Sequence, residues 1–291
     1  MPELPEVETI VRELKKEVLN RTFVDVWTDN ENMIKKPKSF NLFKKEIKGK
    51  IVKRIERRAK NILFYLSGGK MLLIHQKMTG HFLIGKWKRE KNKWTSIIKG
   101  PILEDPMNRF LHLIFWLNNG KMLALTDLRK FAKAELWDEK EFKESAYLKS
   151  LGPEPLEKKF DYNKFKEVLE RKRGKIKQVL LDQTVVAGIG NIYSDEILFV
   201  AKIRPTKNVP ELSEKEKKNI YLGIKNILRL AIKLKGESFS DFRRTNGEKG
   251  FYDKARKVYR KEGEECPVCG EKIQRIKMGG RSAHFCPKCQ K

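Results

Sequence analysis

Four cysteines constrain the C-terminal end of the chain more tightly than any other sequence feature. They form two Cys-x2-Cys pairs, Cys266 with Cys269 and Cys286 with Cys289, and sixteen residues separate the pairs. Two pairs at this separation are typical of a tetrahedral four-cysteine zinc site. All four thiolates are then ligands, so the metal has no open position and is structural. A redox pair or accidental spacing is the alternative, whereas a disulfide framework would spread its cysteines through the chain.

The 291-residue chain is strongly basic, with 65 Lys and Arg against 38 Asp and Glu and a formal net charge of +27. Such an excess is typical of proteins that bind nucleic acid. A basic ribosome-associated protein would share this charge, and a zinc-ribbon transcription factor would share both the charge and the cysteines. The sequence shows no secretory leader and no apolar run of membrane-spanning length, so we expect a cytoplasmic protein with no membrane partner.

The chain starts Met-Pro-Glu-Leu-Pro-Glu-Val-Glu-Thr, at the beginning of a predicted helix. Apolar residues recur every three or four positions from Leu4 to Val18, which predicts one buried helix face. Two prolines are tolerated here because the amides of a first helical turn have no partners to lose. For Glu6 and Glu8 we prefer a helix-capping role at the positive end of the helix dipole.

Short alternating strands joined by turns are expected from residue 23 to residue 137. An Asn-Gly turn at Asn119 is a strong hairpin signal, and the strand spacing favours an antiparallel β-sandwich or barrel. The polar, basic stretch 86–108 is interpreted as a long exposed loop or an irregular insertion. After a Gly-Pro break at residues 151–155 the pattern becomes helical, and its longest helix is expected from Ser213 to residue 235.

A glycine-rich turn, Gly188-Ile189-Gly190-Asn191, lies between two of these helical stretches. Glycines let the backbone approach a ligand, and the amides of a following helix start can hold a phosphate. The basic stretch 171–177 just upstream favours a DNA backbone site. A tight turn between helices needs glycine as well, so this motif alone does not decide.

Taken together, these motifs resemble one family. The N-terminal Pro-Glu-Leu-Pro-Glu, the Arg57-Arg58-Ala59-Lys60 stretch, residues 151–156, residues 182–193 and the cysteine tail closely resemble bacterial formamidopyrimidine-DNA glycosylases over essentially the whole chain.

The resemblance implies an α+β fold in four segments. They are a catalytic N-terminal β-sandwich domain with flanking helices over 1–137, a linker over 138–152, a helix–two-turns–helix DNA-binding domain over 153–257, and a four-cysteine zinc-finger hairpin over 258–291. It also implies one structural Zn²⁺, damaged double-stranded DNA as the partner, and a monomer.

The function implied is that of a bifunctional DNA glycosylase and abasic-site lyase of base excision repair. Such an enzyme removes oxidised purines, namely 8-oxoguanine and formamidopyrimidines, and cleaves the strand by β,δ-elimination. Pro2 would be the nucleophile once Met1 is removed, because a neutral amine at a chain terminus is nucleophilic. Glu3 would be the acid that assists opening of the sugar ring, Lys60 a proton donor and phosphate contact, and Arg281 the arginine of the finger.

The family also implies DNA contacts for other residues. The damaged nucleotide must be flipped out of the duplex, and side chains then fill the gap. From position alone, we would interpret Met78 and Phe131 as core residues and Arg129 as a solvated charge. By resemblance the intercalating residues are Met78, Arg129 and Phe131, and the other DNA contacts are Lys172, Lys177, Asn191 and His112.

Three departures from the family pattern concern DNA contacts. Phe110 stands where the first histidine of a His-x-His pair is common, residues 259–261 replace a Tyr-Gly-Arg, and the insertion 86–108 is longer than usual. The endonuclease VIII branch, which prefers oxidised pyrimidines, is one alternative, although Leu4 and the loop 245–256 favour the purine branch. A non-catalytic binder of damaged DNA is another alternative, against which the intact Pro2 argues.

Overall fold

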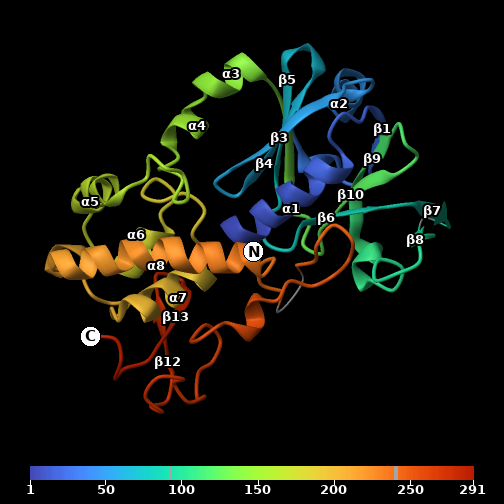
Figure 1. The fold of residues 1–291 in the computed structure, drawn as a ribbon. Coiled ribbons are helices and arrows are strands. Elements are labelled where there is room, and N and C mark those ends of the chain that lie inside the picture. The colour runs from blue at the N-terminus through green and yellow to red at the C-terminus, as the bar shows by residue number, and fades with distance from the viewer. Residues whose placement is uncertain (92, 239–241) are drawn as a thin grey trace. The chain divides into compact units, whose positions relative to one another are not determined.

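Short strands in the N-terminal half pair into two sheets. The computed structural model describes residues 1–91, 93–238 and 242–291. One sheet has four antiparallel strands in the order β1-β9-β10-β6 (Figure 1). The other has five strands in the order β2-β11-β5-β4-β3, with β2 parallel to β11. Their bounds are β1 Phe23–Thr28, β2 Ile34–Lys36, β3 Val52–Arg58, β4 Asn61–Leu66, β5 Lys70–His75, β6 His81–Gly85, β9 Leu111–Leu117, β10 Met122–Thr126 and β11 Lys133–Asp138.

The two sheets bury their inner faces in one hydrophobic core. Phe23 of the four-stranded sheet lies 6.4 Å from Phe64 of the five-stranded sheet, ring centroid to ring centroid, and Phe64 lies 6.0 Å from Phe82 on β6. All three rings are fully buried. This packing confirms the predicted β-sandwich.

Two helices flank the sandwich. Helix α1 (Leu4–Glu17) carries the predicted apolar face into the core, and α2 (Phe40–Ile47) begins where the Ser39 hydroxyl accepts a hydrogen bond from the Leu42 amide. Helices α3 (Glu139–Glu144) and α4 (Ala146–Ser150) follow β11. The bounds of α1 agree with the stretch over which apolar residues recur at helical spacing. That spacing extends as far as the helix packs against the core.

The insertion at 86–108 is more ordered than a loop, which corrects the sequence-based interpretation. Strands β7 (Trp87–Glu90) and β8 (Lys93–Ser96) form an antiparallel hairpin, and a 3-10 helix spans Pro106–Phe110. Lysines dominate the sequence here and hide the pattern, but Trp87 and Trp94 face inward and give the hairpin something to bury.

The chain forms two compact units. Unit 1 comprises residues 1–149 and 235–251, and unit 2 comprises residues 150–234 and 252–291. The four-segment division predicted from the sequence stays a prediction. Unit 2 contains α5 Tyr162–Glu170, α6 Ile176–Leu181, α7 Asn191–Ala201, α8 Glu214–Lys233, β12 Gln274–Met278 and β13 Arg281–Phe285.

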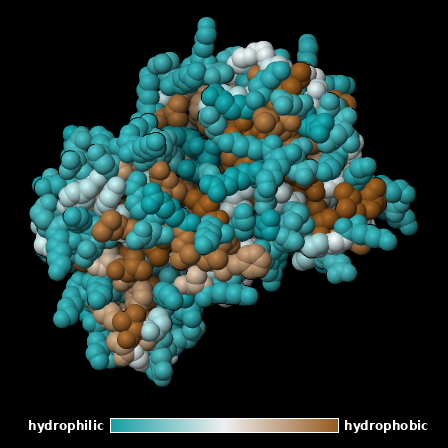
Figure 2. Space-filling view, in the orientation of Figure 1, coloured by the Kyte–Doolittle hydropathy of each residue, from teal (hydrophilic) through white to brown (hydrophobic). Residues whose placement is uncertain are grey.

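The longest helix, α8, begins at the predicted N-cap. The Ser213 hydroxyl accepts from the Glu216 amide at 3.3 Å, and the Glu216 carboxylate accepts from the Ser213 amide at 2.9 Å. This reciprocal pair satisfies two amides that have no partner within the helix. The face of the molecule seen in Figure 2 is mostly hydrophilic. Among the described helices, none combines the length and apolarity needed to cross a membrane.

The buried histidine of β6 generates a prediction about pH. His81 is fully buried, and burial lowers its pKa to about 3, with a smaller contribution from the charge of Arg243. In the unfolded chain a histidine binds a proton below about pH 6.5. Burial of the neutral His81 ring therefore does not lower the free energy of unfolding above pH 6.5. As the pH falls from 6.5 towards 3, the unfolded chain gains a proton that the folded protein does not, and the free energy of unfolding decreases.

We expect His81→Asn to remove about 1.4 kcal/mol per pH unit from the pH dependence of unfolding free energy below pH 6.5. Urea titrations at several pH values, followed by tryptophan fluorescence, measure this slope. All five tryptophans lie between residues 27 and 137, so the signal reports unit 1. Equal slopes for the variant and the parent below pH 6.5 would contradict the prediction, and equal slopes above pH 7 are the internal control.

Candidate functional site

The N-terminal residues are buried at the start of α1. Glu3 is the N-cap and is 2 % exposed, Pro2 is buried, and Met1 is exposed. The Glu3 amide donates to the Glu6 carboxylate at 2.8 Å. The start of the chain is therefore held in one conformation rather than frayed, as a nucleophile and its acid would require.

Glu6 fixes a second segment in addition to the helix start. Its other carboxylate oxygen accepts from the Glu237 amide at 2.8 Å. Gly236 has φ +83 and lies so close that an added Cβ would be 2.8 Å from that oxygen. The capping role predicted for Glu6 is confirmed, and the same carboxylate also holds residues 236–237 against the helix start.

Glu8 does not cap the helix, which corrects the sequence-based interpretation. It is the fifth helical residue, beyond the first four amides that lack intrahelical partners. Its carboxylate instead accepts from Arg57 at 3.0 Å and from Arg12 at 2.8 Å. The Arg57 guanidinium also donates to the carbonyl of Ala59 at 3.1 Å, so Glu8 ties α1 to the turn between β3 and β4.

Lys60 lies in that turn. Ala59 has φ 53, which allows the two-residue connection between Arg58 and Asn61, and Lys60 is 6 % exposed. The Asn61 side-chain amide donates to the Arg58 carbonyl at 2.9 Å and closes the turn. The geometry holds the lysine at a fixed place in the same unit as Pro2 and Glu3.

His75 is a residue that the sequence analysis missed. It ends β5, and it pairs in register with Asn61, the neighbour of Lys60. Burial, with smaller contributions from the charges of Lys77, Lys133 and Lys60, lowers its pKa to about 3. Its Nδ1 accepts from the Lys77 amide at 3.0 Å, so the ring is neutral and carries its proton on Nε2. The sequence pattern that could have identified it is a lone histidine at the end of a predicted strand, two residues before Lys77.

The three predicted intercalating residues meet at the surface. Met78 and Phe131 are 44 % and 52 % exposed, so neither side chain belongs to the core. The Arg129 guanidinium donates towards the Met78 sulfur at 3.1 Å and lies 4.6 Å from the centre of the Phe131 ring. The structure thus rejects the interpretation of Met78 and Phe131 as core residues and brings all three side chains together.

A buried carboxylate, Asp127, joins the two loops that carry this trio. Its oxygens accept from the Thr79 hydroxyl, from the Arg129 amide at 3.2 Å and from the Ala132 amide at 2.7 Å. Asp127 is fully buried. The sequence analysis did not single it out, because only the fold shows that Thr79 and Arg129 are neighbours.

His112 is buried rather than presented to solvent. It is 4 % exposed, and its Nδ1 lies 2.8 Å from the Asp29 carboxylate. Its Nε2 has no hydrogen-bond partner among the described residues. The DNA contact predicted for His112 stays a prediction, and this placement does not favour it.

In unit 2 the glycine-rich turn leads into α7. Gly188 has φ +91, and its amide donates to the Gln183 side chain at 2.9 Å. Asn191 is the first residue of α7, and its side-chain oxygen is buried without a hydrogen-bond partner in the described part of the chain. A helix start suits a phosphate ligand because its backbone amides point towards a bound anion.

The two predicted lysine contacts in unit 2 differ in exposure. Lys172 is 34 % exposed, and its ammonium lies 3.0 Å from Asp182 and 3.1 Å from the Thr184 hydroxyl. Lys177 is 1 % exposed, pairs with Asp195 at 2.5 Å and donates to the carbonyl of Ser282 at 2.7 Å. The geometry makes Lys177 a positioning residue that joins α6 to β13, and not the phosphate contact that the sequence suggested.

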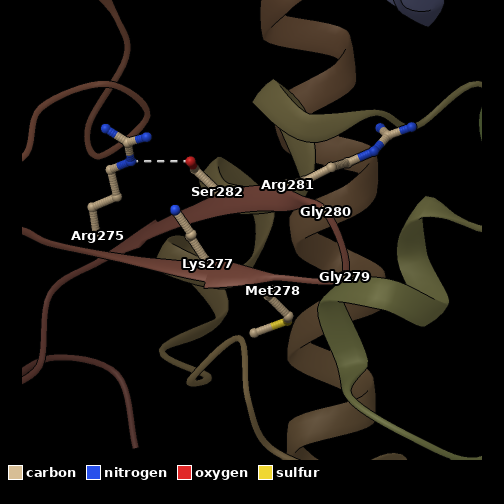
Figure 3. Close-up of a pocket in the computed structure, with 7 residues that line it drawn as sticks. All are labelled: Arg275, Lys277, Met278, Gly279, Gly280, Arg281 and Ser282. Atoms are coloured by element: carbon tan, nitrogen blue, oxygen red, sulfur yellow. Dashed lines mark hydrogen bonds between the residues drawn. The ribbon is translucent and has the colours of Figure 1, made fainter.

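Arg281 begins β13 at the tip of the finger hairpin. Gly279 and Gly280 have φ +55 and +73 and form the turn just before it. Figure 3 shows the Arg281 side chain extending away from Arg275 and Lys277 at this tip. Arg281 is exposed, as a phosphate contact must be.

The four cysteines lie at the base of this hairpin. All four sulfurs lie within 4.8 Å of one another, with 3.9 Å between Cys266 and Cys289 and 3.5 Å between Cys269 and Cys286. Tetrahedral zinc with bonds of about 2.3 Å places its sulfurs about 3.8 Å apart. The donor set therefore fits one structural Zn²⁺, as predicted.

We expect removal of zinc to weaken DNA binding by disordering the finger hairpin, without affecting the fold of unit 1. Chelation, or Cys269→Ser, should release the β12–β13 hairpin that holds Arg281 and weaken duplex binding at least about tenfold. Tryptophan fluorescence should not change, because every tryptophan lies in unit 1. Unchanged DNA affinity after measured loss of one zinc per chain would contradict this.

We expect Asp127→Ala to leave the Ala132 amide and the Thr79 hydroxyl without the acceptor they share, whereas the Arg129 amide still donates to the Thr79 hydroxyl at 3.1 Å. Each buried unsatisfied group costs about 1–3 kcal/mol, so the free energy of unfolding should fall by about 3 kcal/mol. The rate of base excision should fall as well. Asp138→Ala is the control, because its carboxylate is an exposed partner of Lys70. Urea unfolding and an excision assay measure both variants. Equal losses of stability and excision rate in the two variants would contradict the role of Asp127 in joining the two loops.

Comparison with known proteins agrees with this geometry. The N-terminal domain model of formamidopyrimidine-DNA glycosylase matches residues 1–134, its H2TH domain model matches 151–243, and a zinc finger found in FPG and IleRS matches 263–291. The formamidopyrimidine-DNA glycosylase of Desulforamulus reducens is 38% identical over 292 residues, covering 100% of this chain and 99% of the relative. That of Oceanobacillus iheyensis is 37% identical, covering 100% of this chain and 98% of the relative.

Solved structures agree with the whole fold. Lactococcus lactis Fpg in complex with DNA containing an abasic site matches with a TM-score of 0.85 and 36% identity, covering 99% of each chain. A mutant of the same protein with DNA containing Fapy-dG matches with a TM-score of 0.86 and 36% identity over 100% of each chain. The chain belongs to the formamidopyrimidine-DNA glycosylase family.

Proposed function

We propose that this protein excises oxidised purines from duplex DNA and then cleaves the strand at the abasic site, with Pro2 as its nucleophile. The observation that carries the proposal is the exposed trio of Met78, Arg129 and Phe131 in the unit that also holds Pro2 and Glu3 in buried, fixed positions. Exposed apolar side chains beside a cation suit a gap in a base stack. The DNA-bound relatives support this proposal by their fold.

The chemistry starts once Met1 is absent and the Pro2 nitrogen is a free amine. Its lone pair attacks C1′, the bond from C1′ to the base breaks, and the base leaves with that electron pair and takes up a proton, which the Lys60 ammonium can supply. The Pro2 nitrogen then gives its own proton to the Glu3 carboxylate, and Glu3 passes a proton to the ring oxygen, so the bond from C1′ to that oxygen breaks and the sugar opens to an iminium on Pro2. Loss of the C2′ proton then expels the 3′ phosphate, and a second elimination expels the 5′ phosphate.

The remaining predicted residues act on phosphates in this proposal. His75 offers a neutral N–H beside the Lys60 turn, and Asn191, Lys172 and Arg281 contribute from unit 2. Contacts of this kind position the duplex without reading its sequence. We further propose that the protein acts as a cytoplasmic monomer, since one nucleophile serves one flipped nucleotide, and size-exclusion chromatography with light scattering tests the monomer.

Borohydride trapping tests the nucleophile and the substrate together. The duplex carries one 8-oxoguanine opposite cytosine. Two samples of the protein are compared, one with Met1 retained and one with Met1 removed, and mass spectrometry verifies the difference. We expect a covalent complex from the protein that starts at Pro2 and none from the other, because a Pro2 amide nitrogen cannot form an iminium. Trapping by both proteins would remove Pro2 from its role.

The same assay separates the branches of the superfamily. One Lactococcus lactis Fpg structure contains DNA with an oxidised pyrimidine, so we include a duplex of that kind. Trapping on the pyrimidine but not on 8-oxoguanine would assign the chain to the endonuclease VIII alternative. Absence of trapping on either lesion and on an abasic site would leave a damage binder without this chemistry.

Residues 242–251, which overlap the predicted loop 245–256, offer a test of purine excision by itself. Glu13 of α1 accepts from the Arg244 guanidinium at 2.7 Å and from the Thr245 amide and hydroxyl at 3.0 and 2.9 Å. The Thr245 carbonyl in turn accepts from the Ile84 amide at 2.7 Å. A loop that covers the flipped purine would depend on Glu13 for its position. An abasic substrate has no base for this loop to contact.

We therefore expect Glu13→Gln to slow excision of 8-oxoguanine about tenfold, since hydrogen bonds to a charged group contribute about 1.5–3 kcal/mol, and to leave cleavage of an abasic site unchanged. Glu17→Gln is the matched control, because Glu17 lies one turn further along α1 and pairs with Lys121. Single-turnover rates on both substrates provide the measurement. Equal slowing on both substrates would contradict a role limited to the base.

A further inference from the structure

The β7–β8 hairpin is a built surface rather than a passive insertion. Its inward side chains cover the outer face of the four-stranded sheet, and they form a second hydrophobic cluster separate from the sandwich core. The buried members of that cluster are Leu83, Trp87, Ile102, Leu111, Ile114, Met122 and Ala124, and Trp27, Trp94, Ile98 and Trp116 pack against them.

Aromatic contacts hold the hairpin rigidly. The Trp94 ring lies 5.1 Å from Trp27 and 6.2 Å from Trp116, centroid to centroid. The Trp87 indole N–H donates to the Asn108 side chain at 2.8 Å, and Asn108 in turn donates to the Ile102 carbonyl at 2.7 Å. The hairpin is thus pre-organised, so a partner that binds it would not have to order it first.

Cations outnumber acids on this hairpin and on the residues that flank it, although Arg89 shares the inward face with Trp94 and lies 4.8 Å from the centre of the Trp27 ring. The stretch 86–99 holds six basic residues and one acidic residue, Glu90, which pairs with Lys88 at 2.7 Å. The six, all exposed, are Lys86, Lys88, Arg89, Lys91, Lys93 and Lys99. Figure 2 shows hydrophilic atoms at the outer end of the hairpin and hydrophobic atoms where it meets the rest of unit 1.

Covering a sheet face explains the inward tryptophans but not the exposed cations. Residues 139–149 of the same unit, by contrast, hold three lysines and three glutamates. A ribbon with an excess of exposed positive charge is suited to an extended polyanion, and a two-stranded β-ribbon fits a groove of B-DNA. Because the family acts on DNA, we infer that this polyanion is duplex DNA.

We propose that the β7–β8 hairpin is an additional binding surface for the phosphate backbone of duplex DNA, outside the lesion site. The hairpin follows the last residue of β6, whereas Met78 precedes its first residue, His81. Five strand residues separate the two by about 17 Å, so the hairpin adds contacts to flanking duplex and none to the flipped nucleotide. The proposal rests on DNA binding by this chain and is independent of the Pro2 chemistry.

The test measures the salt dependence of binding to an undamaged duplex of about 30 base pairs. The hairpin variant carries Lys86→Gln, Lys88→Gln and Lys93→Gln, and the control variant carries Lys140→Gln, Lys143→Gln and Lys149→Gln. Both lose three charges from the same unit. Each phosphate contact contributes about 0.9 to the slope of log K against log salt, so we expect the slope to fall by about 2 to 3 in the hairpin variant and by less than about 1 in the control.

Two further readouts keep the result interpretable. Single-turnover excision at saturating enzyme should be the same for the hairpin variant and the parent, which shows that the catalytic residues are intact. Unchanged tryptophan fluorescence shows that the hairpin still packs through Trp94. A hairpin variant with the parent's slope, or a control that loses as much slope as the hairpin variant, would overturn the proposal.

Discussion

Burial of one face of α1 in the β-sandwich is the constraint on which the site depends. Val7, Ile10 and Leu14 are fully buried in the core shared by both sheets. Burying each such side chain contributes about 1.5–3 kcal/mol. A helix held this firmly cannot shift along its axis, so the two residues ahead of it, Pro2 and Glu3, take a fixed position that an ordinary chain terminus would not have.

The polar side of α1 extends this order to three other segments. Glu6 holds residues 236–237, Glu8 holds the Lys60 turn through Arg57, and Glu13 holds residues 244–245. Each carboxylate accepts from backbone amides or a guanidinium that would otherwise lack this partner, which makes its loss costly. One helix thereby positions Pro2, Lys60 and a loop that is distant from both in the sequence.

Several site residues were predictable because local patterns carry their chemistry. The cysteine spacing predicts the zinc ligands, and the hairpin signals predict the strands that carry the Lys60 turn. Lys177 was misinterpreted because a lysine in a basic run looks solvated, whereas the fold buries it against Asp195. Asp127 and His75 were missed because their partners lie on other strands, and no spacing in the sequence records that proximity.

By itself the sequence determined the apolar face of α1, the strand-rich N-terminal half, the four-cysteine module and the family, since each depends on residue types at short fixed spacings. Only the tertiary structure decided that Met78 and Phe131 are exposed and lie against Arg129, and that the basic insertion is a hairpin seated on tryptophans. Exposure and contact depend on which distant segments pack together. Side chains of the same type are buried or presented to a partner according to that packing.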